Sequence, residues 1–173
     1  MAVVVSLRDL VDELQTLSDE SHVYLNKVTG KVITITNDDF AMVENDDEIE
    51  EESNDDVSEY SDLEMDFFQD VKKVLSLDDD YLKLPSKFDI DEYEIMERFC
   101  LSIPNKKISG VLLDKIRGSG AFRRFKDTIY RYEIEKDWFK FRDEAYKEFA
   151  ISWLENKGFA YSDDMNKEAQ KKP

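Results

Sequence analysis

The sequence predicts an α+β protein that is mostly helical and has a small antiparallel sheet near its N-terminus. Several long stretches repeat apolar residues every three or four positions, which is the spacing of an amphipathic helix. One short stretch carries β-branched residues on both sides of a glycine, which is typical of a β-hairpin. The chain of 173 residues also has only five Gly and three Pro, and this scarcity favours long regular elements.

The N-terminal part is predicted to contain one helix and three strands. In "SLRDLVDELQTL", residues 6–17, leucines recur at helical spacing, and Ser6 with Asp9 resembles a capping box. The stretches 22–27 and 31–36 are rich in Val and Ile and flank a Thr-Gly turn, so they are expected to pair as a hairpin. The extended piece "DYLKLP" is a candidate third strand beside them.

An acidic segment follows the hairpin. Residues 38–66 contain fifteen Asp and Glu and no Lys or Arg, while the rest of the chain is near neutral, with 26 acids against 24 bases. The centre of the segment has almost no apolar residues and strong self-repulsion, so we expect an acidic loop or a disordered insert. The stretch "DLEMDFFQDVKKVLSL" at its end is expected to be helical.

The C-terminal half is predicted to consist of helices. Asp89 is expected to cap a helix over residues 90–103 that Pro104 ends. Three further helices are expected over residues 107–118, 120–132 and 135–158. The expected organisation is a single domain over residues 1–160 with a polar tail at 161–173.

Several classes of site and location are not expected. Cys100 is the only cysteine, which excludes an internal disulfide, and with His22 as the only histidine zinc is not expected. The acidic runs lack the glycine of a calcium-binding loop. No nucleophile–base pair is evident, so we assign no catalytic residue, cofactor or metal. Neither a membrane span nor a signal peptide is expected, and the cytoplasm is the expected location.

The stretch "IRGSGAFRRFKDTIYRYE", residues 116–133, is basic, with four Arg and one Lys against one Asp and one Glu. A structural interpretation buries Phe122, Phe125, Ile129 and Tyr132 as one stripe and leaves the cations in water, with Asp127 bridging them. A functional interpretation makes Ser119 the helix N-cap, so that the free N–H groups of the first turn and the nearby cations bind an anion. The stretch matches only part of a nucleotide-binding loop.

A second unusual cation lies in the last helix. Arg142 falls between two apolar stripes of that helix, where an unpaired charge would be costly. It therefore either pairs with an internal carboxylate or faces a ligand. The candidate anion- or partner-binding residues are Ser119, Gly120, Arg123, Arg124, Lys126 and Arg142.

The pieces "GSGAFRRFKD" and "WFKFRD", with "VYLNKVTGKVITI" and the acidic stretch after it, resemble an uncharacterised family of small bacterial proteins. The resemblance covers about residues 23–159 and implies a soluble, cytoplasmic bacterial protein. It implies no activity, and it directs attention to the Phe, Arg and Trp residues of the two motifs.

Two functions are expected from these observations. The first is a non-enzymatic interaction or regulatory protein whose acidic segment or basic helix binds another macromolecule, namely a basic or nucleic-acid-binding protein. The alternative is a module that binds a phosphate ligand or RNA through the basic stretch, the only part of the chain suited to nucleic acid. In that case the acidic segment can compete with the ligand for the cations, and deleting residues 44–60 should raise the affinity for a polyanion. No membrane partner is expected.

Overall fold

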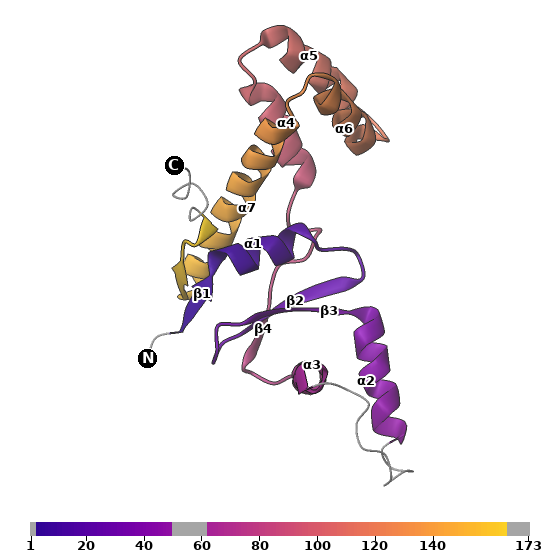
Figure 1. Ribbon diagram of the computed structural model, residues 1–173, viewed down its shortest axis with the longest axis vertical. Helices are drawn as coiled ribbons and strands as arrows, with labels where there is room; N and C mark the ends of the chain where they lie inside the picture. The colour runs from indigo at the N-terminus through magenta and orange to yellow at the C-terminus, as the bar shows by residue number, and fades with distance from the viewer. Residues whose placement is uncertain (1–2, 50–61, 166–173) are drawn as a thin grey trace. The chain divides into compact units, whose positions relative to one another are not determined.

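The chain forms an α+β protein in a computed structural model, which describes residues 3–49 and 62–165. The described residues form seven helices and five short strands (Figure 1). Their contacts fall into two compact units: unit 1 comprises Met1–Lys87 and Leu154–Pro173, and unit 2 comprises Phe88–Trp153. The sequence predicts one domain over residues 1–160, and no Pro- or Gly-rich linker marks the division.

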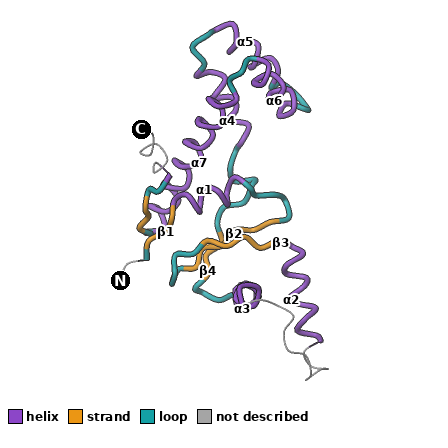
Figure 2. The backbone as a smooth tube through the Cα atoms, in the orientation of Figure 1, coloured by secondary structure: helices purple, strands orange, loops and turns teal. Residues whose placement is uncertain are grey.

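The sheet of unit 1 has three antiparallel strands in the order β3-β2-β4 (Figure 2). The strands are β2 (Ser21–Asn26), β3 (Val32–Thr36) and β4 (Tyr81–Lys83). The predicted hairpin and third strand are thus confirmed. The hairpin turn requires Gly30, whose φ is +77° and whose added Cβ would lie 2.9 Å from the Val4 carbonyl oxygen.

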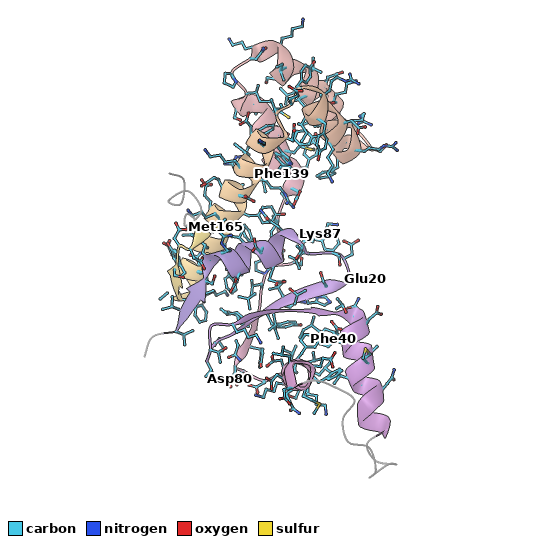
Figure 3. All side chains as sticks on the ribbon, viewed as in Figure 1. Glu20, Phe40, Asp80, Lys87, Phe139 and Met165 are labelled. Carbon is cyan, nitrogen blue, oxygen red and sulfur yellow. The ribbon has the colours of Figure 1, made fainter. Side chains whose placement is uncertain are left out.

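Helices cover both faces of this sheet (Figure 1). Helix α1 (Leu7–Gln15) begins at Ser6, whose hydroxyl accepts from the Asp9 N–H as predicted, and it buries four apolar side chains. On the other face, Ile33 and Ile35 pack with residues of α2 (Asn37–Ile49) and α3 (Asp62–Leu75). Phe40 lies on the side of α2 that faces this cluster (Figure 3).

The acidic segment departs from the expected loop, because its first part is helix α2. Thr36 and Asp39 form a reciprocal capping box: the Asp39 N–H donates to the Thr36 hydroxyl at 3.1 Å, and the Thr36 N–H donates to the Asp39 carboxylate at 2.9 Å. Val43 is buried against the sheet. Acids near a helix start are favourable, so local capping and apolar anchors outweigh the repulsion. Residues 50–61, the centre of the segment, lie outside the described residues.

The predicted polar tail also begins as regular structure. Strand β5 (Ala160–Ser162) pairs in parallel with β1 (Val4–Ser6). Beyond it, the Asp164 carboxylate accepts from the Ser6 hydroxyl at 2.5 Å and from the Arg8 N–H at 2.8 Å. These bonds satisfy donors at the start of α1, and they explain why a polar segment is ordered there.

Unit 2 contains α4 (Glu92–Ser102), α5 (Lys106–Lys115), α6 (Ala121–Arg131) and α7 (Glu135–Lys157) up to Trp153. The N-cap of α4 is Asp91, not Asp89 as predicted, because the Asp91 carboxylate accepts from the Glu94 N–H at 3.0 Å. No helix within the described residues combines the length and the apolar content that a bilayer span requires.

Replacing Asp164 tests the connection between the ends of unit 1. Asp164→Ala removes the acceptor for the Ser6 hydroxyl and the Arg8 N–H, so we expect a loss of about 1–2 kcal/mol in the free energy of unfolding. The measurement is urea unfolding followed by circular dichroism. The control is Asn156→Ala at an exposed position of α7, which should lose much less, and equal losses in the two variants would contradict this role for Asp164.

Candidate polyanion-binding surface on helix α6

The inner side of α6 is fixed by an aromatic cluster. Ala121, Phe125, Thr128 and Ile129 are buried. The Phe125 ring lies 4.8 Å from Trp138 and 6.0 Å from Phe99, centroid to centroid, in edge-to-face geometry. Aromatic pairs of this kind each contribute about 0.5–1.5 kcal/mol beyond burial. The rotation of α6 about its own axis is therefore determined, and so is the set of side chains that it exposes.

The turn before α6 is held by Arg124. Its Nε donates to the Lys115 carbonyl at 2.8 Å, its Nη1 to the Ser119 carbonyl at 2.6 Å, and its Nη2 to the Arg117 carbonyl. These acceptors include orphan carbonyls at the end of α5, which need partners. A cation at a helix C-terminus is also favoured by the helix dipole. Arg124 therefore acts as a tether between two helices.

The predicted N-cap of α6 is wrong. The cap is Gly120, in left-handed conformation with φ 77°, and no side chain caps the helix. Glycine is required here for two reasons. An added Cβ would lie 3.1 Å from the Arg124 Nη1, and any other residue would have to adopt the same positive φ. The guanidinium of Arg124 already donates to three backbone carbonyls, including that of Ser119, so its Nε, Nη1 and Nη2 are directed at the turn and not at an anion.

The outer side of α6 carries aromatic and basic side chains together. We call it the α6 outer face, and it comprises the exposed residues Phe122, Arg123, Lys126, Asp127, Tyr130 and Arg131. At about 100° per residue these positions cover roughly half of the helix circumference. The predicted stripe is wrong for Phe122, which is 47% exposed. The ring of Phe125 fills the aromatic cluster, and Phe122 lies outside it.

The cations of the α6 outer face have no carboxylate partner in the part of the chain that the structure describes. Within residues 3–49 and 62–165, no ion pair involves Arg123, Lys126 or Arg131, and the expected bridges from Asp127 are not formed. Residues 106–131 hold eight Lys and Arg against two Asp. Unit 2 as a whole is balanced, with thirteen acids and thirteen bases, and five of its acids lie between Asp89 and Glu97. The positive charge of unit 2 is therefore concentrated on α5 and α6.

Arg142 pairs with an internal carboxylate, which is the first of the two roles that the sequence allows for it. Its Nη2 lies 2.7 Å from Glu92 Oε1, and its guanidinium lies 5.0 Å from the centre of the Tyr146 ring. The Tyr146 hydroxyl donates to the same Glu92 oxygen. Burial, together with Glu92, raises the pKa of Tyr146. The three side chains connect α4 and α7, and Arg142 has different partners from Arg124.

One hollow in unit 2, of about 380 Å³, is lined by four carboxylates with Arg98 and by apolar side chains. Another, of about 470 Å³, is mainly apolar and lies beside Phe99 and Phe141. None of the six predicted site residues lines either hollow. The structure thus places Arg123 and Lys126 together on the α6 outer face, Ser119, Gly120 and Arg124 in the turn, and Arg142 elsewhere.

Sequence reasoning missed Tyr130 and Arg131 as members of this surface. Tyr130 is 58% exposed and lies two turns after Phe122. The available signal was the spacing of Phe122, Lys126 and Tyr130 at four-residue intervals, which places them in one row beside the buried positions Phe125 and Ile129.

Cys100 is fully buried, and His22 belongs to the other unit, where it bonds to Asn37. Within the described residues no group of three or more potential metal ligands occurs.

Burial predicts an unreactive Cys100 thiol. Burial raises the thiol pKa to about 11, so the folded state keeps its proton where an unfolded thiol begins to ionise. The associated stability is present below the unfolded pKa and is lost as the pH rises towards 11. A disulfide reagent at pH 8 should react slowly with the native protein and rapidly in urea, and Cys100→Ala should lose less stability between pH 9 and pH 11. Rapid reaction of the native thiol would contradict this.

Two neighbouring arginines test the tether. Arg124→Met removes the donors to three carbonyls, and we expect a loss of about 1–3 kcal/mol in the free energy of unfolding. Arg123→Met makes the same chemical change on the exposed face and should leave stability within about 0.5 kcal/mol. Urea unfolding measures the free energy of unfolding of both variants. An Arg124→Met variant that is as stable as the native protein would show that the tether contributes nothing to stability.

One of the comparisons with known proteins finds a match, and it lies in the C-terminal part of the chain. The model of the uncharacterised protein family UPF0158 matches residues 70–173. This range includes all of α4 to α7. It begins after the hairpin, whose sequence also resembles an uncharacterised family of small bacterial proteins. No curated protein and no solved structure matches the chain. Because the match covers more than half of the chain, this protein belongs to the uncharacterised protein family UPF0158.

Proposed function

We propose that this protein is a non-enzymatic module that binds the phosphate backbone of a nucleic acid through the α6 outer face. The observation that carries the proposal is the set of three exposed cations, Arg123, Lys126 and Arg131, that have no carboxylate partner among the described residues. Their helix is fixed from behind by Phe125 and Trp138. A rigid cationic surface pays little ordering cost on binding, since only side chains remain to be positioned.

The arrangement of charge supports a local contact. The whole chain has a formal charge of −17, but unit 2 is balanced, so the excess negative charge belongs to unit 1. At physiological ionic strength, charges further apart than about 8 Å are largely screened. Contacts at the α6 outer face then depend mainly on its own cations. Three phosphate contacts on a single strand give a slope of about −2 for log K against log salt concentration.

A second candidate function rests on the acidic segment at residues 38–66. Its fifteen acids include exposed Asp38 and Glu44 of α2, and they suit a protein partner with a basic or nucleic-acid-binding surface. In this form of the proposal, the segment binds this partner and regulates it. Either function fits a cytoplasmic bacterial protein, which the family resemblance implies.

Neutralising the three cations tests the first proposal. The variant Arg123→Gln, Lys126→Gln, Arg131→Gln should bind a labelled twelve-nucleotide RNA at least tenfold more weakly at about 0.1 M salt and with a flatter salt slope. Fluorescence anisotropy at several salt concentrations gives both quantities.

The matched control removes three exposed lysines from unit 1: Lys31→Gln, Lys73→Gln, Lys83→Gln. It changes the net charge by the same amount, so it should show only the small effect of long-range repulsion. If the control loses as much affinity as the α6 variant, or if the α6 variant loses none, the phosphate-binding proposal is wrong.

A further inference from the structure

We infer that the nucleic acid bound by the α6 outer face is single-stranded, and that two unpaired bases stack on the rings of Phe122 and Tyr130. This inference rests on the proposed function, since the cations hold the backbone. It uses a different observation, which is that two aromatic rings on this face are exposed by 47% and 58%. Charge alone would suit any polyanion, whereas exposed rings between cations suit the faces of nucleobases.

The aromatic and basic residues form two rows along α6. Phe122, Lys126 and Tyr130 follow one another at intervals of four residues, which places them along one edge of the helix. Arg123 and Arg131 lie beside this edge, also eight residues apart. With about 1.5 Å of rise per residue, the rings of Phe122 and Tyr130 are separated by roughly 12 Å along the helix axis, and Arg123 and Arg131 are separated by the same distance. Each ring therefore has a cation one position further along the chain.

This spacing suits an unstacked strand. Neighbouring bases in a stacked strand are about 3.4 Å apart, so two rings separated by roughly 12 Å serve bases that are not adjacent in a stack. A strand that runs along α6 can place one base on each ring and the intervening phosphates near Lys126. The helix has 11 residues, so the contact covers on the order of four nucleotides.

Duplex and peptide ligands fit these residues less well. In a duplex the faces of the bases are covered by their neighbours, and only the base edges are open in the grooves. The exposed rings of Phe122 and Tyr130 would then have no base face to stack on. The carboxylates of an acidic peptide would use the cations, but the Asp and Glu side chains that carry them offer no flat rings to Phe122 and Tyr130. Asp127, in the middle of the face, repels a continuous row of phosphates and confines the backbone to the flanking cations.

The test separates stacking from charge by removing the rings and keeping the cations. The variant is Phe122→Leu, Tyr130→Leu, and the probes are a single-stranded RNA of twelve nucleotides, an abasic strand of equal charge, an RNA duplex and polyglutamate. The native protein should bind the single strand at least tenfold more tightly than the abasic strand, since stacking contributes about tenfold per base. The variant should lose this preference and keep the affinity for the abasic strand.

Two further variants control for structure. Phe88→Leu, Tyr93→Leu removes the same two residue types from exposed positions in the acidic part of unit 2 and should leave all affinities unchanged. Phe122→Tyr, Tyr130→Phe keeps both rings and should retain the preference for the single strand. Thermal unfolding of each variant checks that the fold is intact.

The outcomes distinguish this inference from the proposal on which it rests. If the native protein binds the abasic strand or the duplex as tightly as the single strand, the stacking inference is overturned, while salt-dependent binding that the cation variant abolishes still supports the proposed function. Polyglutamate binding as tight as RNA binding would overturn the inference in favour of an acidic protein partner. If removing the three cations has no effect on any probe, the proposed function itself fails.

Discussion

The contact of Phe125 with Trp138 and Phe99 is the constraint on which the rest of unit 2 depends. These rings come from α6, α7 and α4, so one cluster fixes three helices whose sequence separations are short. It also decides which side of α6 meets water. A helix with so many cations would gain little from packing if it were rotated by half a turn, because its charges would have to leave water. The exposed surface is thus a consequence of the core.

The segregation of charge along the chain has a related physical origin. The basic residues of α5 and α6 lie close together in sequence, and the acids of α4 precede them. Unit 2 is therefore neutral as a whole, but its acidic and basic residues are separated along the chain. A neutral total avoids the self-repulsion that a uniformly charged unit would have. The separation keeps a local attraction for anions despite the negative total of the chain. Arg142, by contrast, is used inside the unit, where Glu92 compensates its burial.

The parts of the fold that the sequence predicts are those governed by local patterns. The hairpin follows from alternating branched residues around Gly30, and α1 follows from its leucines and from Ser6. The start of α2 was missed because composition outweighed a capping box that was visible in the sequence. The tether formed by Arg124 could not be predicted, since its acceptors are backbone carbonyls that become close only when α5 and α6 pack. The site is therefore predictable as a region, and only the packed structure divides its cations between structural and exposed roles.

The parallel pairing of β1 with β5 determines the order in which the protein can fold during synthesis. Unit 2 is continuous in sequence, so all of it leaves the ribosome before β5 does. The aromatic cluster can form as soon as the first turns of α7 emerge, through contacts of short range. Strand β1 must wait, with the donors at the start of α1 open to water, until the segment that ends at Asp164 arrives. Among the described strands, β1 is therefore the first to be synthesised and the last to obtain its partner.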